Sequence, residues 1–197
     1  QGDNRERLTV TINDNIEFDG GLVTWIENLG GDRPFGNDLD PTLNLDVLDA
    51  CFRNCERWNI VATPERLARV RRIIRFQRQL AVSGEFANPR SHIYYLPELY
   101  CAYFGRCYAA LRALPPTAQQ ALDPDDSFAL IRQHVLDYVR DELTAIEMNA
   151  FDAALALLAL AKLGAEPGSF TRPLQCLVGS HGEGGWRAPY RAYEWNK

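Results

Sequence analysis

The chain has 197 residues and a mass of 22.3 kDa, and its hydrophobic fraction of 46% is enough for the core of one soluble domain. With 21 basic and 26 acidic residues the net charge is −5, which argues against a protein that binds nucleic-acid phosphates or anionic lipid. No apolar run reaches the roughly 18 residues that span a bilayer, and the N-terminus has no signal-peptide core. We therefore expect no transmembrane segment.

The chain has an odd number of cysteines, and four of the five lie in helical patterns among apolar neighbours. The five are Cys51, Cys55, Cys101, Cys107 and Cys176. This usage is typical of a cytoplasmic protein whose thiols are reduced and mostly packed. The three histidines are scattered and no C-x2-C pair occurs. The sequence therefore predicts no metal site and no cofactor.

Helical periodicity dominates the chain, and only Leu8–Ile12 alternates as a short strand or extended arm would. The clearest helix start is Thr63 followed by Pro64, because threonine is a good N-cap and proline suits the first turn. Helices are predicted from about Pro41 through Cys55, from Pro64 to Val82, from Leu96 to Leu114, from Asp126 to Leu143, from Met148 to Leu163 and from Ser169 to Val178.

Along the chain, helices that are apolar nearly all round alternate with amphipathic helices. Those near 64–82 and 126–143 are amphipathic, whereas those near 96–114 and 148–163 are apolar nearly all round and should have protein on every side. The alternation repeats about every 50 residues, which favours an all-α array of inner and outer helix hairpins over an irregular helical bundle, the alternative. We expect one domain over 1–197, with an arm and loop over 1–35, hairpins over 36–183 and a further unit or tail from 184.

Two turns share a pattern of glutamine, glycine and an aromatic residue. Gln79 precedes Gly84 and Phe86, and Gln175 precedes Gly182 and Trp186. A glutamine amide can bond the last carbonyls of a helix, and glycine permits the positive-φ exit. These turns resemble the Q-x-x-x-G-x-W repeat of squalene–hopene cyclases and the terpene cyclase and prenyltransferase superfamily. The resemblance implies an α/α toroid, of which this chain would hold about three helix pairs.

The same resemblance implies a catalytic acid at the start of the first inner helix. Asp38-Leu39-Asp40-Pro41 is similar to the D-x-D-D motif of class II terpene cyclases with its last Asp replaced by Pro. On that match Asp40 would donate the proton and Asp38 would be its partner, since paired carboxylates keep one proton at neutral pH. The alternative is that Asp40 is only the N-cap of the helix that begins at Pro41.

An aromatic stripe on the third helix is the candidate substrate wall. Tyr100, Tyr103, Phe104 and Tyr108 follow helical spacing, and rings lining an apolar cavity would bind a polyene and stabilise carbocations. Packing in the core is the alternative for such a stripe. Small residues on the opposite side, Gly105 among them, would let a neighbouring helix approach. The expected substrate-binding residues are Tyr95, Tyr100, Tyr103, Phe104, Tyr108 and Trp186.

Prenyltransferases of this superfamily bind zinc through an Asp-x-Cys pair and a histidine. Asp49-Ala50-Cys51 matches the pair, but two residues apart on a helix lie about 200° apart around its axis. They would not hold one ion together, so we expect no zinc here.

The resemblance thus implies an isoprenoid cyclase-like enzyme, or a component of one, that takes a hydrophobic isoprenoid-like molecule. Two alternatives remain: a non-catalytic helical-repeat module that binds a hydrophobic ligand or a protein partner, and a carbohydrate-active α/α-toroid enzyme with acidic residues beside Trp platforms. We expect no nucleic-acid partner. Because about three hairpins make half a ring, we expect either that the chain is a fragment or that association with a second copy, as a homodimer, completes the ring.

Overall fold

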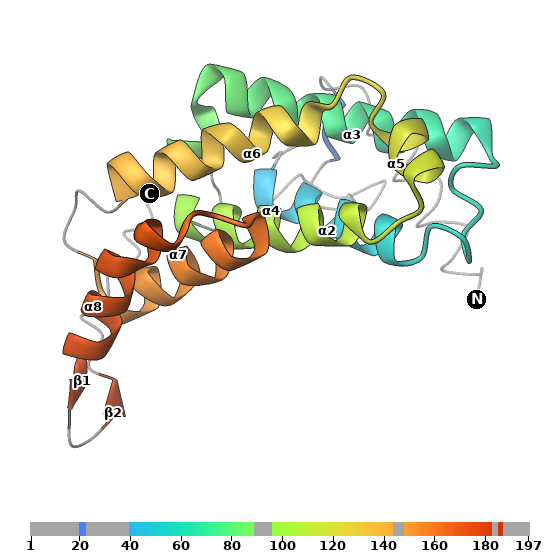
Figure 1. The fold of residues 1–197 in the computed structure, drawn as a ribbon. Helices are drawn as coiled ribbons and strands as arrows, with labels where there is room; N and C mark the ends of the chain where they lie inside the picture. The colour runs from blue at the N-terminus through green and yellow to red at the C-terminus, as the bar shows by residue number, and fades with distance from the viewer. Residues whose placement is uncertain (1–19, 23–39, 89–95, 144–147, 183–184, 187–197) are drawn as a thin grey trace, which may run out of the picture.

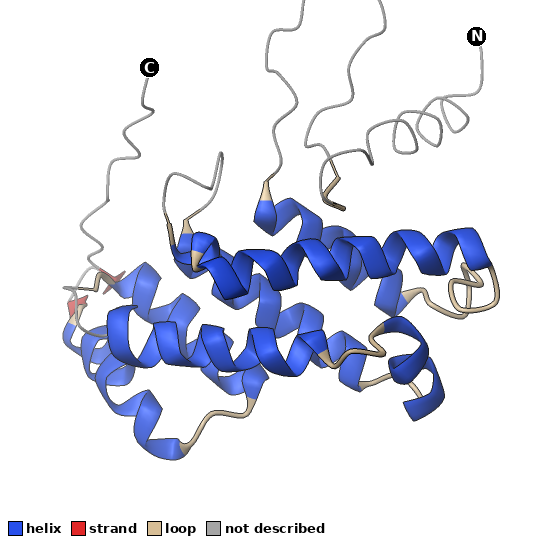
Figure 2. Ribbon diagram, turned by 90° about the horizontal axis from the view of Figure 1, so that it is seen from above, coloured by secondary structure: helices blue, strands red, loops and turns tan. Residues whose placement is uncertain are grey.

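The computed structural model describes residues 20–22, 40–88, 96–143, 148–182 and 185–186. This part of the chain is almost entirely helical, with two strands of two residues each (Figure 2). The predicted all-α class is therefore confirmed. None of its helices combines the length and the apolar character that crossing a bilayer would require.

Three helices form the lower layer in Figure 1 and correspond to the predicted inner helices. They are α2 (Pro41–Arg53), α4 (Pro97–Arg112) and α7 (Ala150–Leu163). Helix α4 packs against both α2 and α7. Helices α2 and α4 begin with proline, whose fixed φ suits the first turn and whose missing N–H would have no partner there. Helix α7 begins after Asn149, whose side chain accepts a hydrogen bond from the Asp152 amide at 2.9 Å.

The upper layer in Figure 1 consists of two amphipathic helices, α3 (Pro64–Ser83) and α6 (Ser127–Asp137), which pack against each other. Helix α8 (Thr171–Gly179) follows α7 in the chain and packs against it. Helices α2, α4 and α7 thus lie in one layer and α3 and α6 in the other, while the inner and outer roles of these layers and their closure into a ring stay predictions.

Several elements differ from the sequence prediction. The 115–126 stretch contains a short helix, α5 (Pro116–Leu122), because Pro116 begins a helix as well as ending the preceding one. A 3-10 turn, η5 (Pro167–Phe170), precedes α8. A small hairpin pairs β1 (His181–Gly182) with β2 (Gly185–Trp186) in antiparallel register. The predicted strand at Leu8–Ile12 lies outside the described residues.

The fourth predicted helix ends in a π-helical turn, η3 (Tyr138–Glu142), that continues α6. Its buried side chains recur every four residues, at Ile131, Val135, Val139 and Leu143. In an α-helix each step of four residues rotates the side chain by about 40°, so the stripe would drift off the core. The wider π turn offsets part of this drift, which keeps Val139 and Leu143 fully buried.

The turn after α3 has the predicted glycine exit at Gly84, but the predicted role of Gln79 is wrong. Gly84 ends the helix with φ of 77°, in the left-handed region that favours glycine. Gln79 is exposed, however, and the glutamine that bonds a carbonyl is Gln77. Its fully buried side chain donates to the Pro41 carbonyl at 2.9 Å and so ties α3 to the first turn of α2. Phe86, in the 3-10 turn η1 (Glu85–Ala87), is buried in the core.

The close contact between α4 and α7 depends on Gly105, as the small-residue face predicted. A Cβ atom at Gly105 would lie 3.1 Å from the Lys162 Cβ and 3.4 Å from the Ala159 Cα. Because these distances are at or below normal contact, a larger side chain would push the two inner helices apart.

Two arginines join helix ends across the fold. Arg71 of α3 donates through Nε to the Ala121 carbonyl at 2.8 Å, at the end of α5. Arg132 of α6 donates to the carbonyls of Leu163 and Gly164 at 2.7 and 3.1 Å, at the end of α7. Both satisfy carbonyls that have no partner within their own helix.

A short segment at 20–22 lies against α2 and α3. Asn44 accepts from the Leu22 amide at 2.6 Å and donates to the Leu22 carbonyl at 2.9 Å, so one side-chain amide binds both polar groups of that residue. Gly20 has φ of 97°, and a Cβ there would lie 2.3 Å from the Arg72 carbonyl oxygen. Only glycine fits this approach.

Candidate functional site

The predicted acid Asp40 caps helix α2. Its side chain is fully buried, and its Oδ1 accepts hydrogen bonds from the amides of Thr42 at 2.8 Å and Leu43 at 3.1 Å. Two amides of the first turn of α2 therefore use this carboxylate oxygen as their acceptor, which is the arrangement of an N-cap. The capping alternative is therefore the role that the geometry displays. Asp38 lies outside the described residues.

This cap makes a specific prediction for unfolding. Asp40→Ala is expected to lower the free energy of unfolding by about 1 kcal/mol, because the two amides lose their acceptor. Asp40→Asn is expected to stay within a few tenths of wild type, since asparagine caps equally well. Urea unfolding followed by circular dichroism measures both. Equal loss in the two variants would show that the negative charge, and not the hydrogen bonds, stabilises this end of α2.

The predicted aromatic stripe divides between the core and the surface. Tyr100 and Phe104 are fully buried, with ring centroids 6.5 Å apart, and Phe104 also stacks on Phe128 at 5.4 Å. Burial raises the pKa of the Tyr100 hydroxyl well above its usual range, so the phenol stays neutral. Tyr103 is half-buried under the Arg106 guanidinium, 4.6 Å from the ring centroid.

The rings that surround this stripe come from other helices. Phe52 of α2 lies 5.6 Å from Phe128 of α6, and Phe86 lies 5.3 Å from Tyr100. The predicted wall thus meets aromatic side chains from two other elements, η1 and α6, and Phe52 of α2 packs behind Phe128, as in a core. Tyr95 lies outside the described residues, and Trp186 lies in β2.

A charged cluster links α2 and α4. The Arg106 guanidinium contacts Asp46 at 2.8 Å and Asp49 at 3.4 Å, and Arg53 binds Asp49 at 2.8 Å. Burial raises the pKa of Asp46, and the neighbouring Arg106 opposes that rise. The Asp49 carboxylate therefore forms ion pairs with two arginines. Burial raises the pKa of the neighbouring Cys51 thiol to about 11. Within the described residues no three His, Cys, Asp or Glu side chains are arranged to hold a metal ion.

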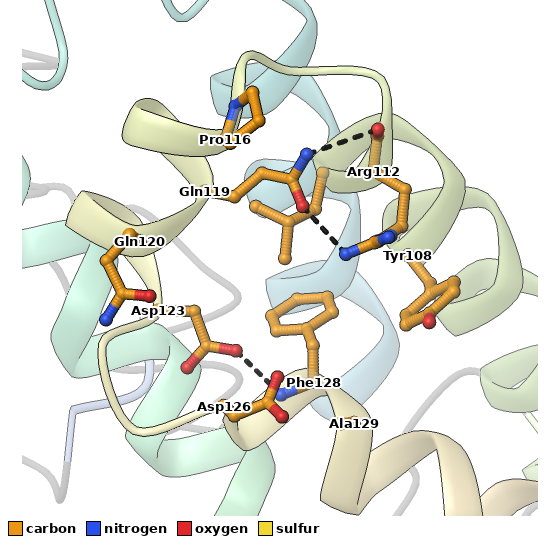
Figure 3. A pocket seen from close by; sticks show the side chains of 10 residues that line it. Tyr108, Arg112, Pro116, Gln119, Gln120, Asp123, Asp126, Phe128 and Ala129 are labelled. Atoms are coloured by element: carbon orange, nitrogen blue, oxygen red, sulfur yellow. Dashed lines mark hydrogen bonds between the residues drawn. The ribbon is translucent and has the colours of Figure 1, made fainter.

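A pocket of about 410 Å³ lies where the end of α4, helix α5 and the start of α6 meet (Figure 3). Its floor is apolar, formed by buried Leu111 and Phe128, and Tyr108 of the predicted stripe lies at its edge. Polar side chains surround this floor. The lining residues are Tyr108, Leu111, Arg112, Pro116, Gln119, Gln120, Asp123, Asp126, Phe128 and Ala129.

Hydrogen bonds hold the walls of the pocket in place. Gln119 donates to the Leu114 carbonyl at 2.7 Å and accepts from the Arg112 guanidinium at 2.9 Å, which fixes that guanidinium at one wall (Figure 3). On the opposite wall Asp123 accepts from the amides of Ser127 and Phe128, at 2.9 and 2.8 Å, and so caps α6. The walls are therefore pre-formed, as most small-molecule sites are.

Sequence reasoning found only Tyr108 of this pocket. Among the residues it missed, those between 115 and 125 lie where no helix was predicted, and the others lie on or beside α4 and α6. Asp126 is one of the missed residues. It has φ of 52°, an unusual conformation for a residue other than glycine. Its exposed side chain lines the pocket. The acidic run Asp123-Pro124-Asp125-Asp126 before an apolar helix was the available signal.

Comparison of the chain with protein-family models, with curated proteins and with solved structures found no match. The geometry described above is therefore the basis for a functional proposal.

Proposed function

We propose that the chain is a non-catalytic helical-repeat module that binds a small, polyhydroxylated, sugar-like molecule in the pocket between α4, α5 and α6. The observation that carries this proposal is the pre-formed pocket of about 410 Å³ with an apolar floor and polar walls. Its volume falls in the range of about 300–1,000 Å³ that small-molecule sites occupy.

The chemistry of the walls supports this ligand class. Arg112 provides donors, the Asp126 carboxylate provides acceptors, and Gln120 provides both. Adjacent hydroxyl groups of a sugar donate and accept at once, so they match such a mixed wall. Phe128 and Tyr108 offer apolar ring surface for the C–H face of the same molecule. A fully apolar polyene would leave the polar groups of the walls without partners.

Two placements favour a binding module over the acid-initiated cyclisation that the resemblance implies. Asp40 uses its carboxylate as a helix cap, and Tyr100 and Phe104 pack against aromatic side chains in the core. Cyclisation of a polyprenyl substrate remains the competing proposal. It requires that Asp40→Asn abolish turnover of such a substrate while the fold stays intact.

The binding test uses NMR spectra of the full chain during titration with D-glucose, N-acetyl-D-glucosamine and maltose. We expect amide shifts concentrated in residues 108–129 with at least one of these sugars, and a dissociation constant in the millimolar range, because the pocket is open to solvent. Asp126→Gly removes the carboxylate and tolerates the positive φ. It is expected to weaken binding at least tenfold.

Asp125→Gly is the matched control, because Asp125 is an exposed neighbour that does not line the pocket. It is expected to bind as wild type does. The proposal is overturned if none of the three sugars shifts the 108–129 amides, or if Asp125→Gly weakens binding as much as Asp126→Gly.

A further inference from the structure

Opposite charges lie at the two sides of the pocket without forming an ion pair. Arg112 lies at one wall and Asp126 at the other, and the apolar floor of Leu111 and Phe128 separates them (Figure 3). Within the described residues neither of these two charged groups has an ion-pair partner, whereas Arg140 pairs with two neighbouring aspartates. A ligand in the pocket therefore meets a positive group on one side and a negative group on the other.

The hydrogen bonds within the walls determine what each side offers to a ligand. On the α4 side one amino group of Arg112 donates to Gln119, which leaves its Nε and its second amino group as donors. On the α6 side the Gln120 amide group donates to the Pro124 carbonyl at 3.4 Å, so its oxygen stays available as an acceptor. The Asp126 carboxylate adds two more acceptors there. Donors thus face a ligand from α4 and acceptors from the start of α6.

Negative charge predominates on the α6 side. Asp123 and Asp126 both line the pocket, whereas Arg112 is the single cation of its described lining. Asp123 is buried and accepts two amides of α6, so the positive end of that helix offsets part of its charge. Asp126 is exposed and makes no such capping bond. Its carboxylate is therefore the one that a ligand can reach.

We propose that the pocket selects amino sugars over neutral and acidic sugars, with the ligand ammonium bound by Asp126. This inference rests on the proposed function, because it assigns the charge of the same ligand. An ammonium group only donates, so it matches the acceptors of Asp126 and Gln120, while ring hydroxyls accept from Arg112. Bonds between an ammonium and a carboxylate are charge-assisted and are stronger than those of a neutral hydroxyl.

NMR titrations of the full chain at pH 6 test this selection with D-glucosamine, D-glucose, N-acetyl-D-glucosamine and D-glucuronate. At pH 6 the free amine is protonated, because an amine beside electron-withdrawing groups has a pKa of about 8. D-glucosamine is expected to bind about threefold or more tightly than D-glucose and N-acetyl-D-glucosamine, a modest gain because Asp126 is exposed. D-glucuronate is expected to bind no more tightly than D-glucose.

Asp126→Asn tests whether this carboxylate binds the ammonium. Asparagine tolerates positive φ and keeps one acceptor oxygen, so the substitution removes mainly the charge. The dissociation constants of D-glucosamine and D-glucose are compared within each variant, which cancels any general loss of affinity. In Asp126→Asn the two constants are expected to become equal. Asp125→Asn is the matched control, because it removes the same charge one residue outside the lining and should keep the preference.

The outcomes separate this inference from the proposed function. If D-glucosamine and D-glucose bind wild type equally well, or if D-glucuronate binds most tightly, the selection is overturned while the sugar site stands. A preference that persists in Asp126→Asn, or that Asp125→Asn also abolishes, shows that Asp126 does not bind the ammonium and likewise overturns the inference. If no sugar, charged or neutral, shifts the 108–129 amides, the proposed function fails as well.

Discussion

Phe104→Ala is expected to lower the free energy of unfolding by about 3–5 kcal/mol, the usual cost of removing a large ring from a close-packed core. Phe104 is fully buried, and its ring contacts Tyr100, Tyr108 and Phe128. A ring that lined a solvent-filled cavity would cost much less to remove, because little packing would be lost. The experiment therefore separates core packing from the predicted substrate wall.

Phe151→Ala is the matched control, since the same atoms are removed from a side chain that is 49% exposed. Its expected cost in urea unfolding is below about 1 kcal/mol, because a half-exposed side chain loses little packing when it is removed. If Phe104→Ala and Phe151→Ala had similar effects, the aromatic cluster would not be the centre of the core, and a cavity beside Phe104 would regain support.

Asn44→Ala is expected to have the second largest effect, a loss of about 2–3 kcal/mol. The Asn44 side chain is buried and makes three hydrogen bonds, two to Leu22 and one to the Asp40 carbonyl. Without it, partly buried backbone groups of Leu22 lose their partners, and each such group costs about 1–3 kcal/mol when it stays dry. Urea unfolding measures the change in stability, and limited proteolysis reports release of the 20–22 segment.

Asn54→Ala serves as the control for this experiment. Asn54 ends the same helix, and its side chain makes one hydrogen bond, to the Ala50 carbonyl at 2.9 Å. We expect a change below about 1 kcal/mol and no new cleavage near Leu22. Cleavage at the same rate in both variants would mean that Asn44 does not hold the segment.

The helices that could be predicted from sequence are those with strong local signals. Pro41 and Pro64 mark helix starts, and Gly84 marks an end, because their backbone preferences act without help from distant residues. The two helix layers followed from the contrast between apolar and amphipathic helices, which reflects how much of each helix is covered. These signals are local, so one sequence was enough.

Features that depend on contacts between distant segments were not predictable in the same way. Gln77 reaches Pro41, 36 residues earlier in the chain, and nothing in its local sequence distinguishes it from exposed Gln79. Asn44 binds Leu22 through a similar long-range contact. The aromatic stripe was visible, but whether it faced a cavity or the core depended on Phe128, whose packing partners are on other helices.

The functional site was hard to predict for the same reason, because its residues come from separate segments of the chain. The sequence directed attention to Asp40, where a short motif resembled a known catalytic pattern. The pocket of about 410 Å³ instead includes Arg112 and Asp126, from either side of a helix that was not predicted. A motif match describes spacing along the chain, but a binding site is defined by side chains that the fold brings together.

The π-helical turn at Tyr138–Glu142 also constrains how the length of this chain can change. Such a turn contains more residues than an α-helical turn, so a one-residue deletion there could be absorbed by a change to ordinary α-helical winding. Leu143 would then follow Ile131 by eleven α-helical steps, a net rotation of about 20°, so it would keep its buried orientation. A one-residue deletion within the turn should therefore leave the apolar pattern after it unchanged, whereas a deletion in α6 itself should shift that pattern by about 100°.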